Sequence, residues 1–392
     1  MPSTTSGLPT RDDIVHALRG VIDPELGSDV VDLGMVGDQF DIRPDGTVVV
    51  TVALTTAGCP LRAQLQRDVT NRVASLPGVS KVEVAWREMT DEEKKRAMDR
   101  ARFNIATRQE QSSIAPTTRV VAVSSGKGGV GKSSVTVNLA VALAARGLRI
   151  GVLDADIWGF SVPRMLGIDA QLGAHMVGER KLMIPNERKV DDGVLRVVSM
   201  GFLSDEQDAL MWRGLILNRA VQHFVQDVDW GDDLDYLLID MPPGTGDVQM
   251  GVAKLIPRTE VLVVTTPAQA AQKVAFRAVS MARKNYLRVA GVIENMSAFV
   301  CDHGTSYPLF GEGGGEALAH DAGAPLLGHV PLEPAVAIGG DTGQPVALGE
   351  GPAADAFRSI ATRIVDVAIP ATDLSGCTAR ILEAAEAALP RQ

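Results

Sequence analysis

The chain has 392 residues, of which 45% are hydrophobic and 22% are charged, so it can bury at least one full core and we expect two domains. Its 38 basic and 48 acidic side chains give a formal charge of -10, which opposes binding to nucleic acid. The N-terminal segment lacks the charged and apolar regions of a signal peptide, and no apolar run approaches the roughly 20 residues of a membrane span. We therefore expect a cytoplasmic globular protein that binds neither nucleic acid nor a membrane.

Residues 1–89 are predicted to form a small α+β domain with a core of its own. The apolar pattern indicates, in chain order, a helix over 13–21, a strand over 47–54, a helix over 61–76 and a strand over 79–86. Residues 90–117 are rich in charge and poor in apolar periodicity, which is typical of an exposed linker, either helical or flexible.

Residues 118–372 are predicted to form a larger α/β domain. Runs of β-forming residues such as RVVAVSS and EVLVVTTP alternate with helical segments, which favours βαβ crossovers. The runs are apolar almost throughout, as strands covered on both faces require. We expect a mostly parallel sheet with helices on both faces and ligands at the carboxyl ends of its strands. Residues 373–392 can form a C-terminal helical tail.

A phosphate-binding pattern follows the first predicted strand of this domain. Residues 126–133 read GKGGVGKS, which satisfies G-x-x-x-x-G-K-[ST] between a strand and a helix. Its glycines let successive N–H groups face phosphates, Lys132 would reach the β- and γ-phosphates, and Ser133 would bind Mg²⁺. A flexible glycine-rich turn is the plainer alternative. The predicted nucleotide-binding residues here are Gly126, Lys127, Gly128, Gly129, Val130, Gly131, Lys132, Ser133 and Ser134.

Carboxylates follow two other predicted strands. Asp240 ends the run YLLID, a position typical of the aspartate that holds Mg²⁺ through water, and Gly244 beyond it can present its N–H to a γ-phosphate. Asp154 and Asp156 follow the run LRIGVL, and one of them could orient the attacking water. A turn or a helix cap is the alternative for each of these positions.

Lys127, one residue after the first glycine of the pattern, gives the chain a resemblance to the MinD/ParA-like ATPases with a deviant Walker A motif. Those proteins hold two nucleotides between two chains. The resemblance implies a homodimer in which Lys127 reaches the partner's phosphates, and it implies that Asp156 activates water. The catalytic residues it predicts are Lys127, Lys132, Asp156 and Asp240.

Further segments resemble the Mrp/ApbC-type iron-sulfur cluster carriers over about 250 residues: DADIWGFSVPRMLG, MWRG, DMPPGTGD, ENMS, FGEGGG and GHVPLEP. This resemblance implies that Asn295 and the region from Pro331 to Glu333 contact adenine. An Asn-Lys-x-Asp guanine motif is absent from the sequence, so we expect ATP. A polar cap at a strand end is the alternative for Asn295.

The N-terminal domain resembles the SufT-like iron-sulfur assembly domain through DPELGSDVVDLGMV and LTTAGCPLR. The matching polar positions are Asp23, Glu25 and Cys59. Cys59 could offer a thiolate near a helix start, where the helix dipole lowers the pKa of a thiol, or it could be an ordinary packed cysteine.

The sequence holds three cysteines, Cys59, Cys301 and Cys377, too few for a cluster site of four thiolates in one chain. The carriers usually have Cys-x-x-Cys after ENMS, whereas here the text is Cys301-Asp302-His303-Gly304. The resemblance implies a cluster, of the 4Fe-4S type, between Cys301 of two chains, with His303 or an outside thiol completing the coordination.

Three functions are compatible with these patterns. The first is an ATP-hydrolysing carrier that transfers a cluster to iron-sulfur apoproteins and works with assembly factors. The second is a MinD/ParA-like positioning ATPase, although the polar face of the C-terminal segment carries Glu383 and Glu386 rather than the basic residues that an anionic membrane favours. The third is a scaffold whose ATPase only switches its affinity for partners.

Overall fold

The computed structural model describes residues 7–37, 40–55, 61–156, 159–169, 171–178, 180–199, 215–301 and 303–372, without the side chains of 105–111, 215–220 and 247. These residues form two compact units, a smaller one built on 7–111 and a larger one built on 112–285 and 289–371. None of the described helices is long and apolar enough to cross a membrane.

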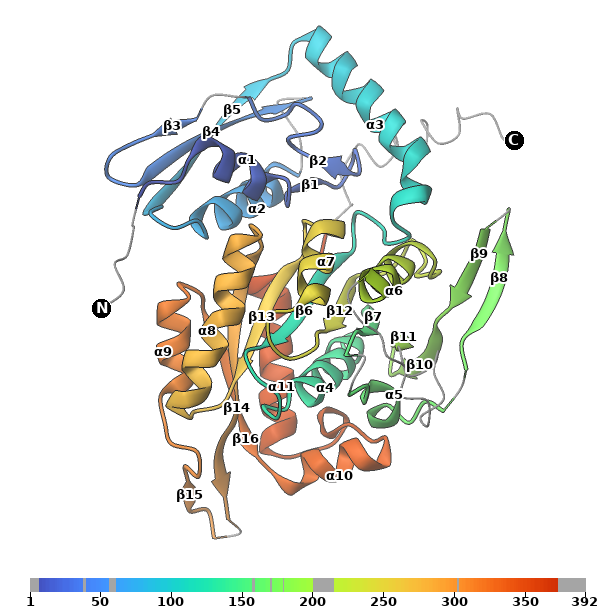
Figure 1. Cartoon of the computed structure of the whole chain (residues 1–392), viewed down its shortest axis with the longest axis vertical. Coiled ribbons are helices and arrows are strands. Elements are labelled where there is room, and N and C mark those ends of the chain that lie inside the picture. Colours follow the sequence, from blue (N-terminus) through green and yellow to red (C-terminus); the bar gives the residue numbers. More distant parts are fainter. Residues whose placement is uncertain are drawn as a thin grey trace. The chain divides into compact units, whose positions relative to one another are not determined.

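The smaller unit is an α+β structure, as predicted. Its elements are α1 (Arg11–Leu18), β1 (Ile22–Asp23), β2 (Ser28–Asp29), β3 (Asp41–Ile42), β4 (Thr47–Leu54), α2 (Arg62–Ala74), β5 (Lys81–Glu88) and α3 (Asp91–Gln111). Helix α1 begins at a capping box, in which Thr10 and Asp13 each bond the other's backbone N–H. Strands β3, β4 and β5 form a sheet in that order, and α2 packs on β5 (Figure 1). The segment predicted as a helical or flexible linker is largely the helix α3.

The larger unit alternates strands and helices. Its elements are β6 (Arg119–Ser125), α4 (Lys132–Ala144), β7 (Arg149–Asp154), α5 (Val162–Met165), β8 (Gly173–Val177), β9 (Arg180–Ile184), β10 (Asn186–Val190), β11 (Gly193–Ser199), α6 (Leu215–Gln226), β12 (Tyr236–Asp240), α7 (Asp247–Leu255), β13 (Glu260–Thr265), α8 (Gln269–Lys284), β14 (Arg288–Val300), β15 (Ser306–Tyr307), α9 (Gly314–Asp321), β16 (Leu326–Leu332), α10 (Pro334–Thr342) and α11 (Pro352–Arg363).

The main sheet has the order β10-β11-β7-β12-β6-β13-β14-β15, and β16 pairs with β14. The pairs in its centre are parallel, and the antiparallel pairs lie at the two ends, β10 with β11 and β14 with β15. The prediction of a mostly parallel sheet is confirmed. Strands β8 and β9 form a separate antiparallel hairpin.

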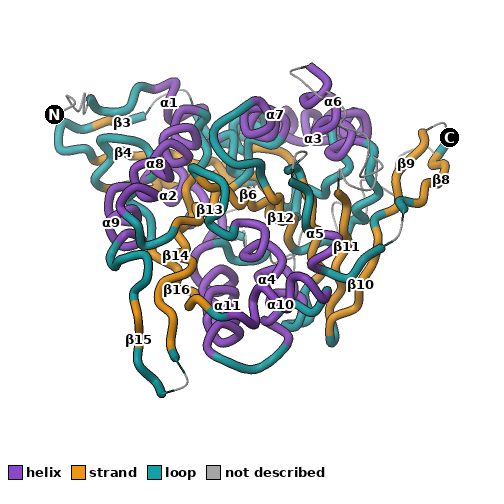
Figure 2. The backbone as a smooth tube through the Cα atoms, turned by 60° about the horizontal axis from the view of Figure 1, so that its bottom comes forward, coloured by secondary structure: helices purple, strands orange, loops and turns teal. Residues whose placement is uncertain are grey.

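Alternate residues of each central strand enter different cores because side chains of a strand point to opposite faces. Val121 and Val123 of β6 pack in a core with α4 and α11, whereas Val120 and Ala122 pack in a core with α6 and α7. Figure 2 shows these two pairs of helices on the two faces of the sheet. Every residue of β12 and β13 is buried, as expected for strands with helices on both sides.

Candidate functional site

The phosphate-binding pattern forms a loop between β6 and α4, at the carboxyl edge of the sheet. Gly131, immediately before α4, has a φ of 77°, a left-handed conformation that favours glycine. Gly126 has no room for a side chain, because a Cβ there would lie 2.1 Å from the carbonyl oxygen of Val274. The loop therefore leads directly into a helix N-terminus, where free N–H groups and the helix dipole attract phosphates.

A pocket of about 220 Å³ lies over this loop. It is smaller than the roughly 300–1,000 Å³ of pockets for whole drug-sized ligands, so it suits a phosphate chain better than an entire nucleotide. Its lining is the loop together with residues from three neighbouring segments: Ser125, Lys127, Gly128, Gly129, Val130, Gly131, Lys132, Ser133, Ser134, Asp156, Ser161, Met165 and Pro243. Lys127 is exposed at this pocket.

Asp240 is the centre of a hydrogen-bond network beneath the pocket. Its fully buried carboxylate accepts hydrogen bonds from Lys132 Nζ to Oδ1 (2.7 Å) and from Ser133 Oγ to Oδ2 (2.5 Å). Thr136 Oγ1, one helical turn after Lys132, is also 2.8 Å from Oδ1. A hydroxyl and a carboxylate beside a helix N-terminus are the oxygen ligands that Mg²⁺ takes with phosphates, so these residues fit a magnesium nucleotide.

The structure separates the roles of the two aspartates that follow β7. Asp154 is fully buried and accepts hydrogen bonds from the backbone N–H groups of Asp156, Ser161 and Val162 and from Ser199 Oγ. Burial, and then the nearby charge of Asp240, raise the pKa of Asp154 to about 7. Asp154 therefore organises the loop.

Asp156, in contrast, lines the pocket, with its Oδ2 3.9 Å from Lys132 Nζ. Of the two carboxylates, only Asp156 is in a position to meet water beside a bound phosphate.

The loop after β12 gives the N–H of Gly244 a partner within the chain. This N–H donates to the carbonyl of Ser125 (3.1 Å), at the end of β6. Gln249 Nε2 holds the same loop through the carbonyls of Pro242 (2.7 Å) and Gly244 (3.2 Å). Gly244 can serve a γ-phosphate only if its N–H exchanges its partner.

Two of the residues that were predicted to contact adenine, Asn295 and Glu333, form hydrogen bonds within the chain. Asn295, on β14, is buried and donates from Nδ2 to the carbonyl of Val130 in the phosphate loop (2.9 Å). Pro331 lies in β16, and Glu333 precedes α10 and accepts a hydrogen bond from the N–H of Ala353 (3.1 Å). The adenine contacts of these residues remain a prediction.

Cys301 lies at the turn of the hairpin that β14 and β15 form. Its N–H bonds the carbonyl of Thr305 (3.0 Å), and its carbonyl accepts from the N–H of Gly304 (2.8 Å). The N–H of His303, and then that of Thr305, favour the thiolate and lower the pKa of Cys301. The side chain of His303 is exposed. The turn thus favours the thiolate form of Cys301, which is the form that binds metals.

Two of the three polar positions predicted in the smaller unit, Asp23 and Glu25, are buried and close together in the chain. Asp23 Oδ1 accepts from the N–H groups of Glu25 (2.8 Å) and Leu26 (3.0 Å), and burial raises the pKa of Asp23 to about 6. Glu25 is buried, and its Oε1 has no hydrogen-bond partner within the described part of the chain. Cys59 and Cys377 lie outside the described residues.

Two features of the larger unit were not predicted from the sequence. Thr136 could have been found, since it follows Lys132 by one helical turn on the side of Asp240. The other feature joins residues from three elements: Glu294 Oε1 lies 2.9 Å from His329 Nδ1, and Glu316 Oε1 lies 3.3 Å from His329 Nε2. No local motif in the sequence indicates this second set.

The sequence matches two known protein families. The ParA family of NUBPL iron-transfer P-loop NTPases matches residues 116–365, and the iron-sulfur cluster assembly protein family matches residues 11–86. An iron-sulfur cluster carrier protein of Mycobacterium tuberculosis is 47% identical over 341 residues, which cover 85% of this chain and 86% of that protein. One from Synechocystis is 39% identical over 360 residues, covering 91% of this chain and 97% of that protein.

A solved structure supports the same assignment. The nucleotide-binding protein of Archaeoglobus fulgidus in complex with ADP is 31% identical, with a TM-score of 0.52, and the match covers 65% of this chain and 96% of that one. The phosphate loop, the buried Asp240 and these matches lead to one conclusion. The chain belongs to the ParA-type family of iron-transfer P-loop NTPases, with an iron-sulfur cluster assembly domain at its N-terminal side.

Proposed function

We propose that this protein is an ATP-binding and ATP-hydrolysing carrier that holds an iron-sulfur cluster between two copies of the chain and transfers it to apoproteins. The observation that carries the proposal is the convergence of Lys132 and Ser133 on the buried carboxylate of Asp240. An acid, a hydroxyl and an ammonium group meet there at the N-terminus of α4, as a site for a magnesium nucleotide requires.

In this mechanism Lys132 would turn from Asp240 to the β- and γ-phosphates. Ser133 and Asp240 would hold Mg²⁺, which would supply positive charge to neutralise the phosphates. Asp156, at the pocket, orients the attacking water. The backbone N–H groups of the loop bind the phosphates at the N-terminus of α4. Asn295, Pro331 and Glu333 are proposed to lie near the adenine.

Lys127 has a role in this proposal only if the protein forms a homodimer. It is exposed at the pocket, and in this proposal Lys132 binds the phosphates of its own chain. We assign Lys127 to the nucleotide of the partner. In mixed dimers, Lys127→Ala in one chain should impair hydrolysis at the nucleotide of the other chain. Loss of hydrolysis only at its own nucleotide would contradict this assignment.

The cargo site is proposed at Cys301. Two chains supply two thiolates, and His303 of each chain, or an outside thiol, completes the coordination of a 4Fe-4S cluster. Incomplete protein ligation makes a cluster easy to surrender, which suits transfer to apoproteins and exchange with assembly factors. We propose that the protein acts in the cytoplasm without nucleic acid or a membrane, and its formal charge of -10 opposes binding to nucleic acid.

Anaerobic reconstitution of single-cysteine variants tests the cargo site. Cys301→Ser should abolish the absorbance of the reconstituted cluster and leave ATP hydrolysis within about twofold, because Cys301 is not among the residues that line the pocket. Cys377→Ser is the matched control and should change neither property. His303→Ala should weaken retention of the cluster. A full complement of iron and sulfide in Cys301→Ser would refute the site and make Cys59 the main candidate.

A further inference from the structure

We propose that Asn295 and Met296 couple the phosphate pocket to the hairpin that carries Cys301, so that bound nucleotide changes the exposure of this thiol. The inference rests on the proposed function, in which a nucleotide controls a cargo on Cys301. It concerns the route of that control within one chain.

The first link is direct contact between β14 and the phosphate loop. Asn295 Nδ2 donates to the carbonyl of Val130 (2.9 Å), and a Cβ added at Gly131 would lie 2.3 Å from the same nitrogen. The methyl carbon of Met296 would be 3.4 Å from that Cβ. The last residues of the loop before Lys132 therefore rest on Asn295 and Met296. A shift of the loop toward phosphates must either move these two side chains or break the hydrogen bond.

The second link is a break in β14 immediately after this contact. Asn295 pairs with Val330 and Phe299 with Leu332, so four steps along β14 span only two steps along β16. Met296, inside the break, has a φ of 58°, a left-handed conformation that non-glycine residues rarely adopt. Such a bulge interrupts the ladder and redirects the strand beyond it. Beyond Asn295, the segment that leads to Cys301 contacts β16 again through Ser297 Oγ, which donates to the carbonyl of Val330 (3.2 Å), and through the pairing of Phe299 with Leu332.

The third link is the base of the hairpin, where Glu294 before the hairpin and Gly315 after it are joined by a hydrogen bond. On the returning side, the N–H of Gly315 donates to Glu294 Oε2 (2.6 Å), next to Asn295 in the chain. Glu294 in turn contacts His329 Nδ1 through Oε1 (2.9 Å). Before Gly315, Gly311 and Gly313 have left-handed φ values of 89° and 78°. Both connections of the hairpin therefore change direction just outside an anchored base.

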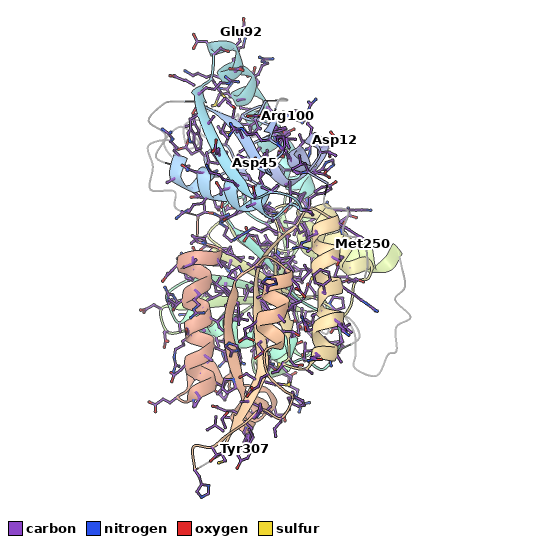
Figure 3. The ribbon with its side chains drawn as sticks, turned by 90° about the vertical axis from the view of Figure 1, so that its left-hand side faces the viewer. Asp12, Asp45, Glu92, Arg100, Met250 and Tyr307 are labelled. Carbon is purple, nitrogen blue, oxygen red and sulfur yellow. The ribbon has the colours of Figure 1, made fainter. Side chains whose placement is uncertain are left out.

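The hairpin beyond this base is weakly packed. Figure 1 shows β15 and the end of β14 projecting from the main sheet, and Figure 3 shows Tyr307 on this projection. Four of its apolar side chains are about half exposed or more: Val300 (45%), Tyr307 (46%), Leu309 (61%) and Phe310 (45%). A rotation at Met296 would break the contacts of Ser297 and Phe299 with β16 but few buried apolar contacts in the hairpin, whereas the same rotation below Asn295 would disrupt the main sheet.

The reactivity of Cys301 measures this coupling without a cluster. In a full-length Cys59→Ser, Cys377→Ser background, the rate of Cys301 alkylation by iodoacetamide is measured with and without Mg-ATP. We expect nucleotide to change the rate by about fivefold or more, the lower end of typical allosteric couplings. Met296→Gly keeps the left-handed backbone but removes the contact with Gly131 and loosens the hinge. It should reduce the change to less than about twofold while ATP affinity stays within about twofold.

Two variants control for backbone effects. Asp191→Gly alters another non-glycine residue with a left-handed backbone (φ 47°), in the turn between β10 and β11, and should retain the full response. Met296→Leu keeps an apolar side chain over Gly131 and should retain most of it. The coupling is overturned if nucleotide leaves the alkylation rate unchanged in the background protein, or if Met296→Gly responds as fully as the background. If the protein fails to bind iron, the cargo proposal is contradicted, but the effect of nucleotide on the alkylation rate should remain.

Discussion

The nucleotide site and the Cys301 hairpin are built in opposite ways. Asp240 has no exposed surface and Lys132 only 6%, and both lie in a network that includes Ser133 and Thr136. The hairpin has a second strand of only two residues, Ser306–Tyr307. A buried, fully bonded site distinguishes ligands precisely, whereas a weakly packed one can move and release what it holds. The difference suggests that one site reads the nucleotide and the other delivers the cargo.

The largest effect is expected when the positive charge of Lys132 is removed from the nucleotide site. Lys132→Ala should lower ATP affinity by about a hundredfold or more, because it deletes the ammonium group directed at the phosphates and leaves Asp240 buried without its ion pair. Calorimetric titration measures the affinity, and a melting curve checks that the protein is folded. Lys254→Ala, at an exposed lysine, is the control. Affinity equal to that of the wild type would show that the pocket is not the nucleotide site.

Replacing Asp156 separates binding from chemistry. Asp156→Ala should bind ATP yet hydrolyse it about 10²–10⁴ times more slowly, the usual range for loss of a group that assists proton transfer. Asp154→Ala should mainly lower thermal stability, because several backbone N–H groups would lose their acceptor. Single-turnover hydrolysis and nucleotide titration distinguish the two variants. Equal loss of binding and hydrolysis in Asp156→Ala would indicate a structural cap.

Thr136 should have a smaller effect, confined to the metal. Thr136→Val keeps the shape of the side chain but removes a donor to Asp240 Oδ1. A net hydrogen bond of about 1 kcal/mol corresponds to a rise of about fivefold in the Mg²⁺ concentration needed for half-maximal hydrolysis. Binding of ATP without Mg²⁺ should not change, and Thr136→Ser should restore the wild-type requirement. An unchanged Mg²⁺ requirement in Thr136→Val would exclude Thr136 from positioning Asp240.

The smallest expected effect is on the pH dependence of the hairpin. Because backbone N–H groups lower the pKa of Cys301, its thiolate forms at a lower pH than that of a free cysteine. Alkylation of Cys301 should reach half its maximal rate at a lower pH in the folded protein than in urea, where the turn is lost. A midpoint in the folded protein that is no lower than in urea would mean that the turn does not favour the thiolate.

Sequence could predict the buried site better than the hairpin. The residues from Gly126 to Ser133 are contiguous, and Asp240 ends a strand whose apolar pattern is plain, so local signals sufficed. The contact of Asn295 with Val130 joins positions 165 residues apart, and the link from Glu294 to His329 spans 35. Pairing of such distant segments leaves no local pattern, and a strand as short as β15 has no periodicity to detect.

If nucleotide controls the release of a cluster held on Cys301, as we propose, the rate of cluster transfer must depend on nucleotide. Protein loaded anaerobically is mixed with an iron-sulfur apoprotein, and transfer is followed by absorbance with Mg-ATP and without nucleotide. We expect the two rates to differ by about fivefold or more. Asp156→Ala, which should bind ATP but hydrolyse it slowly, distinguishes an effect of binding from an effect of hydrolysis. Equal transfer rates with and without Mg-ATP, from a protein that binds both ATP and cluster, would contradict this proposal.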